Sequence, residues 1–403
     1  MLRQRSSSQI FFDALLLLSV CLALTFGLFC DVGVGNITLG VVAPFLAIGT
    51  GRLVSLRSKF VKQELLTHLM RISGPYILLI LFPLVCSSGI ALLRGDLNGK
   101  AALLEFAECF LFWMVMELSV LFAWENSKRA KWLFLFCAVA LFVNFLFWVA
   151  TGAGSRFDGF STHKNVVGGV SLVIGTLCLA QILAHPPRAR WPSVLVITLG
   201  LSLVMTFASS SRTSLMCLLA ATCLVAVSKR LYLSRMSLWV FLIGTLVFVA
   251  LVPPIYLNLE RLWFFESLDQ AFRSVSSNGI YSGRETKWGQ VWTEVASQPV
   301  FGYGYQWKLV FVHKTMHAHN LYLGKLFQTG VFGFLCFLAF NLSCIRQSLQ
   351  SDKPKIGCLY AIVFVHQCFE INYTMGGVPV GCAIAVLIGA LLRLANHHDE
   401  VED

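Results

Sequence analysis

Residues 132–152 read WLFLFCAVALFVNFLFWVATG, a run of twenty-one residues without a charge and with few polar side chains. A helix needs roughly 20 predominantly apolar residues to cross the hydrocarbon core of a bilayer. This stretch has the length and the composition of such a helix. It therefore predicts a membrane-spanning segment rather than the core helix of a soluble domain.

The composition of the whole chain agrees with this interpretation. Of its 403 residues 57% are hydrophobic and only 13% are charged, whereas soluble globular domains carry about 25% charged residues. Phenylalanine alone accounts for 33 residues. Most of the 13 cysteines lie inside apolar runs, where they resemble small hydrophobic residues and not a disulfide framework or a zinc site. We expect an integral membrane protein.

Comparable apolar runs recur along the chain, so the predicted fold class is an all-α polytopic membrane protein with about twelve membrane-spanning helices. The first run has a basic start but is not followed by a convincing cleavage site, and we expect it to be retained as a helix. The predicted spans lie near residues 10–30, 36–51, 74–93, 103–124, 132–152, 166–185, 193–209, 213–228, 237–253, 320–345, 356–375 and 377–395.

Lys and Arg are concentrated in alternate loops, which indicates that these loops and both termini face the cytoplasm. The net charge of +11 thus follows from membrane topology and does not indicate nucleic-acid binding. The predicted organisation is one integrated domain: nine spans over 1–253, a long loop on the non-cytoplasmic side over 254–319, and three spans with a short cytoplasmic tail over 320–403.

The long loop is expected to be ordered, because it is rich in Trp and Tyr and because loops of this length in compact proteins are commonly functional. Its first part predicts an amphipathic helix after a stop at Pro253 and Pro254. Trp263, Phe264 and Phe265 would place that helix in the membrane interface.

The second part of the loop predicts another helix, from Arg284 to Val295. Its apolar residues follow the i, i+3, i+4, i+7 pattern of one helix face. Pro299 and the glycines of FGYGY (301–305) end it in a turn. The predicted face consists of Trp288, Val291, Trp292 and Val295.

Two arginines on the non-cytoplasmic side are candidate anion ligands. Arg212, in SSSRTSL (209–215), lies between two apolar runs. An arginine at membrane depth costs about 2.5–3.5 kcal/mol on insertion scales, so it needs a partner or a function. Its guanidinium suits bidentate binding of phosphate, although a snorkelling helix-end arginine is the alternative. Arg284, in SGRETKW (282–288), follows a glycine at a predicted helix start, where a phosphate could bind; the alternative is a solvated loop arginine.

Three histidines occur in HKTMHAHNLYL (313–323). His313 and His317 have the i, i+4 spacing of some zinc sites, but the stretch contains neither an HExxH pattern nor a carboxylate. The favoured interpretation is that one imidazole acts as a general base, since its pKa near 6.5 suits proton removal at neutral pH. Loop histidines without a chemical role remain the alternative.

Several acidic residues fall inside predicted spans, namely Glu105, Glu108, Glu117 and Glu370. Together with His366 they could form a proton path. We favour the interpretation that some of them pair with basic residues inside the helix bundle.

Taken in order, these motifs resemble the O-antigen ligase and polymerase superfamily of bacterial envelope glycosyltransferases. The resemblance covers roughly residues 154–335; residues 1–150 match only as hydrophobic helices. It is carried by RFDGFSTHKN, SSSRTSL, SGRETKW, PVFGYGY and HAHNLYLGKLFQTGVFG. The HKN element (163–165) is most similar to that of polymerases of secreted polysaccharides.

The resemblance implies an inverting, metal-independent glycosyltransferase of the inner membrane with a periplasmic active site and no cofactor. Its donor would be an undecaprenyl-diphosphate-linked oligosaccharide and its acceptor a sugar hydroxyl. By the same resemblance Arg212 and Arg284 bind the donor diphosphate and His319 activates the acceptor. The expected neighbours in the substrate site are His317, Asn320, Lys164, Asn165, Arg156 and Tyr305.

Two reactions share this chemistry. A polymerase uses another lipid-linked glycan as acceptor, and a ligase uses the lipid A-core oligosaccharide. We favour a polymerase because of the HKN element and because the sequence contains no large acceptor-binding domain. A transporter or flippase of lipid-linked oligosaccharides is disfavoured, since the sequence shows neither inverted repeats nor paired broken helices. An intramembrane metal hydrolase would rest on the histidines alone.

Overall fold

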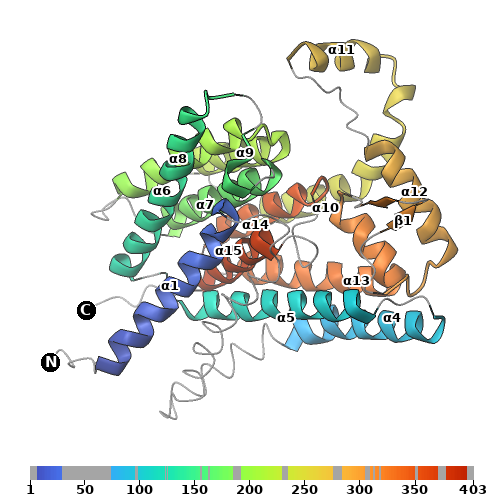
Figure 1. Cartoon of the computed structure of the whole chain (residues 1–403), viewed down its shortest axis with the longest axis horizontal. Coiled ribbons are helices and arrows are strands. Elements are labelled where there is room, and N and C mark those ends of the chain that lie inside the picture. The colour runs from blue at the N-terminus through green and yellow to red at the C-terminus, as the bar shows by residue number, and fades with distance from the viewer. Residues whose placement is uncertain are drawn as a thin grey trace.

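The computed structural model describes residues 7–29, 74–95, 99–122, 124, 126–154, 157–161, 164–184, 192–228, 235–275, 284–304, 309–311, 314–316, 319–349, 353–370 and 378–396. Within these ranges the protein is helical apart from two short antiparallel strands (Figure 1). The predicted span near 36–51 lies outside the described residues.

The long helices form one body in which α14 and α15 occupy the centre (Figure 1). The helices are α1 (Ser7–Phe29), α4 (Phe82–Leu93), α5 (Gly99–Leu121), α6 (Ser127–Ala150), α7 (Lys164–Ala184), α8 (Pro192–Ala208), α9 (Arg212–Ser228), α10 (Arg235–Leu257), α11 (Phe265–Val275), α12 (Arg284–Ser297), α13 (Leu321–Leu349), α14 (Lys355–His366) and α15 (Val378–Asn396). Shorter elements are the π-helical turn η2 (Ile77–Leu81), the 3-10 turns η3 (Gly159–Ser161) and η4 (Leu259–Arg261), and the strands β1 (Leu309–Phe311) and β2 (Lys314–Met316).

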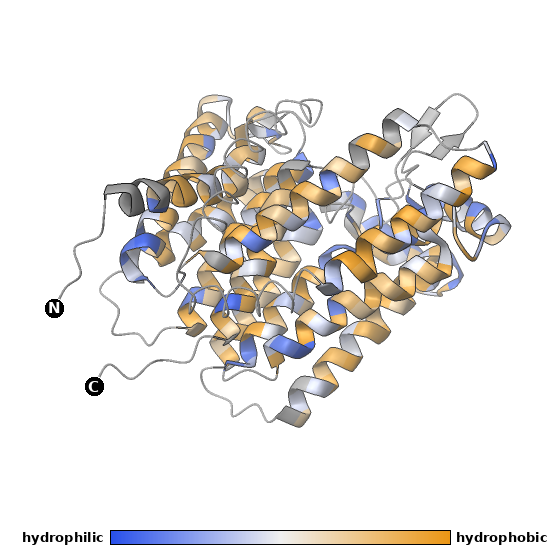
Figure 2. Cartoon of the chain, turned by 90° about the horizontal axis from the view of Figure 1, so that it is seen from below, coloured by the Kyte–Doolittle hydropathy of each residue, from blue (hydrophilic) through white to orange (hydrophobic). Residues whose placement is uncertain are grey.

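Five of the described helical segments are long and apolar enough to cross a membrane: Gly74–Leu93, Ser127–Ala150, Lys164–Ala184, Trp239–Leu257 and Leu321–Leu349. Shorter apolar helices accompany them, and hydrophobic residues predominate along the long helices (Figure 2). The outward faces of α6, α8 and α10 carry exposed Phe, Leu, Ile and Val side chains, as lipid-facing helices do. These features support a polytopic membrane protein; the total of twelve spans stays a prediction.

Helix α7 is buried along most of its length, because it packs between α8, α9 and α15. Small residues allow this close packing. A Cβ atom at Gly168 would lie only 2.3 Å from the Cβ of Ser211, the residue just before α9. The starts of α7 and α9 are therefore held against each other.

Helix α13 is interrupted at Gly330, whose φ of 61° and ψ of −167° are not helical. The turn after α12 fills this interruption: the Val331 N–H donates to the Pro299 carbonyl (2.7 Å), and the Phe327 carbonyl accepts from the Tyr303 N–H (2.9 Å). The next pair is exchanged in the same way, with bonds from Phe332 to Val300 and from Gly304 to Gln328. Backbone groups freed by a helix break inside a membrane protein must find such partners. The predicted turn is thus confirmed over its described residues, 299–304, and docks into α13.

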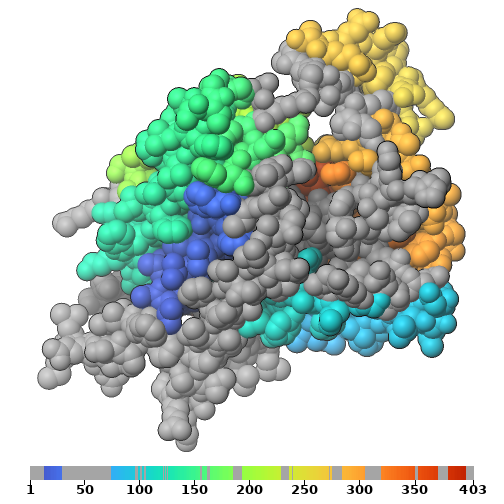
Figure 3. All heavy atoms as spheres, in the orientation of Figure 1, coloured from blue at the N-terminus to red at the C-terminus, as the bar shows by residue number. Residues whose placement is uncertain are grey.

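The loop after α10 differs from prediction in two places. The expected stop at Pro253 and Pro254 is wrong: both prolines lie in the last turn of α10, which continues to Leu257. Each proline lacks the N–H group that would close one hydrogen bond of the helix, and α10 ends within one turn of Pro254. The amphipathic helix α11 accordingly begins only at Phe265, and it projects from the helical body (Figures 1 and 3).

Helix α12 begins at Arg284, as predicted. Its residues Trp288, Val291 and Val295 are buried, which confirms three of the four residues of the predicted apolar face. Trp292, the fourth residue of that face, is 54% exposed.

Candidate functional site

The predicted site residues that the structure describes share one feature: each stands at the start of a helix. Arg212 is the first residue of α9, Arg284 of α12 and Lys164 of α7. His319 and Asn320 immediately precede the first residue of α13. A helix start carries free backbone N–H groups and a partial positive charge. Four such starts surround a single piece of chain, residues 366–370 (HQCFE), which we call the 366–370 segment.

The 366–370 segment begins with a contact to α9. His366 is buried, and its Nε2 lies 2.9 Å from Oγ of Ser214, which in turn lies 2.8 Å from Oγ of Ser211. The Gln367 amide faces Nδ1 at 3.3 Å; because an amide nitrogen can only donate, Nε2 carries the proton and donates to Ser214. This chain fixes the first turn of α9, while the Arg212 side chain at the same turn is exposed.

The next contact of the segment reaches α13. The Gln367 carbonyl accepts the N–H of Leu321 (3.0 Å). Buried Asn320 caps the same helix: its Oδ1 accepts the N–H groups of Tyr322 (2.9 Å) and Leu323 (3.0 Å). Asn is among the preferred residues for this position. Its role in the structure is that of a helix cap.

His319 adopts φ of 47°, in the left-handed region. This conformation is uncommon outside glycine, although histidine is enriched in it, and it persists where the surroundings enforce it. The cap at Asn320 and the bond from Gln367 provide that enforcement. The side chain of His319 is partly buried at the mouth of α13, a suitable position for a base that must reach a substrate.

The segment ends at Glu370, which lies beyond the end of α14 and is 5% exposed. Its Oε1 lies 3.4 Å from Nη2 of Arg284, and Asn165 forms a hydrogen bond with the carboxyl group. Burial raises the pKa of Glu370 to about 7, while Arg284, Asn165 and Lys164 act in the opposite direction. The interpretation that a buried acid pairs with a basic residue is confirmed for Glu370.

Aromatic rings hold the start of α12 in place. The Phe369 ring centroid lies 5.9 Å from Cζ of Arg284, a cation–π arrangement. Trp288, one turn after Arg284, packs between Tyr256 and Phe369 with ring centroids 4.6 and 6.2 Å apart. The guanidinium is therefore positioned by packing as well as by its ion pair.

The structure thus brings Lys164, Asn165, Arg212, Arg284 and the His319–Asn320 pair to the borders of one segment. The remaining predicted neighbours His317, Arg156 and Tyr305 lie outside the described residues, as does His313. The proton path through the acids of α5 stays a prediction. Among the described residues, no group of three or more His, Cys, Asp or Glu side chains could hold a metal ion.

Sequence reasoning missed the architectural role of the 366–370 segment. The predicted span 356–375 placed it inside a helix, whereas α14 ends at His366. A signal was present: His366 and Glu370 are polar groups in an otherwise apolar run. Polar residues that bound a membrane helix are commonly functional, and their spacing marks where this helix ends.

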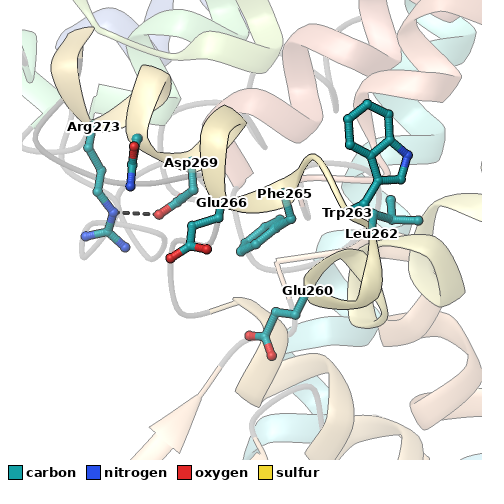
Figure 4. A pocket seen from close by; sticks show the side chains of 8 residues that line it. Glu260, Leu262, Trp263, Phe265, Glu266, Asp269 and Arg273 are labelled. Atoms are coloured by element: carbon teal, nitrogen blue, oxygen red, sulfur yellow. Dashed lines mark hydrogen bonds and ion pairs between the residues drawn. The ribbon is translucent and has the colours of Figure 1, made fainter.

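A separate cavity of about 540 Å³ lies along α11 (Figure 4). It is acidic, because it contains three carboxylates and one arginine, and that arginine is held by Asp269 at 2.6 Å. Its negative charge disfavours a diphosphate, and none of the predicted site residues within the described ranges lines it. The lining residues are Glu260, Leu262, Trp263, Phe265, Glu266, Asp269, Gln270 and Arg273.

These features define a class: a polytopic helical membrane protein in which several helix starts, two of them bearing arginine, meet at one buried segment. Residues 197–338 match the family model described as O-Antigen ligase. The matched stretch contains Arg212, Arg284 and His319, and it confirms the resemblance to the O-antigen ligase-like superfamily. No curated protein matches the chain. The family comprises glycosyltransferase-like membrane enzymes of ligase or polymerase type.

Proposed function

We propose that the protein transfers an undecaprenyl-diphosphate-linked oligosaccharide to a sugar hydroxyl at the periplasmic face of the bacterial inner membrane. In this proposal it polymerises the repeat units of a surface polysaccharide, either O-antigen or exopolysaccharide. The observation that carries the proposal is the common attachment of the α9, α12 and α13 starts to the 366–370 segment. These starts bear the two arginines and the histidine of the family-matched stretch.

The donor diphosphate suits the two arginines. Each guanidinium can bind phosphate oxygens in bidentate fashion, and the free N–H groups of each helix start favour an anion. Negative charge grows on the diphosphate as the glycosidic bond breaks. Fixed positive groups at that place lower the barrier because they need little reorganisation. The arginines thereby supply charge without a divalent ion, and we expect no cofactor.

His319 acts on the acceptor. Its imidazole takes the proton of the acceptor hydroxyl as the oxygen attacks the anomeric carbon. The new C–O bond forms on the face opposite the diphosphate, and the bond to the diphosphate breaks, so the configuration inverts. Undecaprenyl diphosphate leaves with the bonding electron pair, and His319 afterwards returns its proton to solvent.

The placement of Lys164 and Asn165 favours a polymerase. These residues of the HKN element form the start of α7, and Asn165 bonds to Glu370 beside Arg284. The element that is similar to polysaccharide polymerases therefore borders the proposed donor site. The second candidate is an O-antigen ligase, which would join the glycan to lipid A-core at the same arginines and histidine.

A deletion strain tests the proposal through its surface glycans separated on a gel. A polymerase predicts loss of the polymer with single repeats remaining on lipid A-core; a ligase predicts accumulation of long lipid-linked chains. Complementation with His319→Ala should fail, whereas Arg261→Ala, an exposed arginine of η4, should restore the polymer. Membrane insertion of each variant is checked by immunoblot.

An assay with purified protein distinguishes an enzyme from a transporter. With a lipid-linked repeat unit as substrate, an enzyme releases undecaprenyl diphosphate and forms a longer glycan. A flippase forms neither product. Normal polymer from the His319→Ala strain, or no released carrier from active wild-type protein, would contradict the assignment.

A further inference from the structure

Glu370 lies where an anionic ligand would be expected. Its carboxylate contacts the Arg284 guanidinium and the Asn165 side chain, with Lys164 close enough to act on it. Guanidinium, ammonium and amide donors recognise carboxylates and phosphates alike. Two of these groups also start helices, α12 and α7, whose N-termini favour either anion.

We propose that the Glu370 carboxylate occupies the position that one phosphate group of the donor takes, so that the donor must displace Glu370 from Arg284. The inference rests on the proposed function, since it assigns the displaced contact to a diphosphate. It makes Glu370 a specificity-determining residue for the ligand and gives it no role in the transfer step.

The geometry of the ion pair fits a contact that exchanges. Nη2 of Arg284 lies 3.4 Å from Oε1 of Glu370, longer than the roughly 2.7–2.9 Å of a strong charge-assisted hydrogen bond. By comparison, Arg273 on α11 approaches Asp269 at 2.6 Å. A guanidinium has five N–H donors, and this contact uses one of its nitrogen atoms. Its side chain is 20% exposed, and Phe369 supports it from within the fold.

The displaced carboxyl group can remain buried at low free-energy cost if it becomes protonated. A charged carboxylate that loses its partner in a buried site is strongly disfavoured, whereas a protonated one is tolerated. The pKa of Glu370, raised by burial to about 7, makes protonation accessible near neutral pH. The charged groups acting on it are Arg284 of α12 and Lys164 of α7. The other titratable groups of the segment are His366, which is hydrogen-bonded to Ser214 of α9, and the buried thiol of Cys368.

In a site that faces a bilayer, competition by Glu370 would help to exclude membrane phospholipids. Membrane phospholipids carry phosphodiester groups with a single negative charge and surround the protein at high concentration. To enter the site, a ligand must bind Arg284 more strongly than the Glu370 carboxylate does. A diphosphate, with more charge and more oxygens, does so more readily than a phosphodiester, and discrimination by an opposing contact is a common route to specificity.

The test measures binding of radiolabelled inorganic pyrophosphate to the full-length protein in nanodiscs between pH 6.5 and 8.5. Glu370→Gln keeps the shape and hydrogen bonding of the side chain and removes its charge. If ionised Glu370 alone competes, a pKa of about 7 predicts that this variant binds about twofold tighter than wild type at pH 7 and about thirtyfold tighter at pH 8.5. Comparison at equal pH cancels the ionisation of pyrophosphate itself.

Three further variants complete the test. Glu285→Gln removes the same charge one residue from Arg284, in the first turn of α12, and should tighten binding by less than about threefold at any pH. Glu370→Asp retains the charge and should retain the pH dependence. Arg284→Gln should abolish binding. Equal tightening by the two glutamine variants, weaker binding by Glu370→Gln at pH 8.5, or no binding by any protein would overturn the inference.

The outcome is separable from that of the proposed function. If purified protein transfers no glycan but the pyrophosphate results are as expected, the anion site stands and the glycosyltransferase proposal falls. If transfer is observed and Glu370→Gln binds pyrophosphate as wild type does, the enzyme assignment stands and the role of Glu370 falls. Thermal unfolding of each variant confirms that it is folded.

Discussion

Arg212 and Arg284 are the same residue at the same position of a helix, yet the protein restrains them differently. The Arg212 side chain is exposed, and what is fixed is the turn beneath it, through Ser211, Ser214 and His366. The Arg284 side chain is 20% exposed and is held directly by Glu370 and Phe369. We infer that a ligand reaches Arg212 at an exposed position above a fixed turn, whereas it reaches Arg284 by displacing Glu370.

The largest effect is expected from Arg212→Ala. It removes a positive group at the developing negative charge and should lower kcat/KM for transfer by about 10²–10³-fold. Transfer is measured with a lipid-linked repeat unit, and Arg261→Ala serves as the matched exposed arginine, with activity expected to be unchanged. Activity of Arg212→Ala within twofold of wild type would remove Arg212 from the proposed donor site.

Arg284→Lys should lower kcat by about tenfold, because an ammonium keeps the charge but cannot reproduce the planar, bidentate contact. Arg273→Lys is the control, since Arg273 also pairs with an acid but lies on exposed α11. We expect this control to behave as wild type in the same assay. A wild-type rate for Arg284→Lys would mean that Arg284 acts only as a point charge or through packing.

His366→Gln sharpens the comparison, because His366 is hydrogen-bonded to Ser214 in the turn of Arg212. Loss of its hydrogen bond to Ser214 should reduce kcat/KM by about fivefold, equivalent to roughly 1 kcal/mol. Combined with Arg212→Ala it should add almost nothing, whereas combined with Arg284→Lys the effects should multiply. Multiplication in both combinations would indicate a general loss of stability, which thermal unfolding would reveal.

The smallest effect is expected from a chelator. If the two arginines supply the positive charge for the diphosphate, EDTA should leave the transfer rate of purified protein within about twofold of the untreated rate. Strong inhibition that added Mg²⁺ or Zn²⁺ reverses would show that a cation shares their task. The histidine-based metal hypothesis would then regain support.

The sequence predicted individual residues of the site, such as Arg284, better than the 366–370 segment at its centre. Arg284 at a helix start followed from the glycine and the apolar period after it, and the structure agrees. The end of α14 at His366 was not predicted, because hydropathy is averaged over about 19 residues. The apolar residues Cys368 and Phe369 therefore extended the predicted span beyond the helix. Its contacts join four helices that are far apart in sequence. Such tertiary contacts have no local signal, and neither does the left-handed conformation of His319.

The loop after α10 shows the opposite error, in which a local rule was applied too strictly. Two consecutive prolines predicted a helix stop, but α10 continues through both of them and ends at Leu257. The apolar period of α12 gave its face but not how much of it is buried: α12 packs chiefly on α13 and α10, and Trp292 at the edge of that face stays exposed.

The interruption of α13 at Gly330 also has a mechanical consequence. In an unbroken helix, torsion passes from turn to turn through consecutive backbone hydrogen bonds. Here two of those bonds are exchanged for bonds to the turn after α12: Phe327 and Gln328 of the first half accept from Tyr303 and Gly304, and Val331 and Phe332 of the second half donate to Pro299 and Val300. Both halves of α13 are therefore tied to the turn that follows α12. We infer that a shift of α12, which begins at Arg284, reaches the half of α13 that carries His319 at its mouth through this turn.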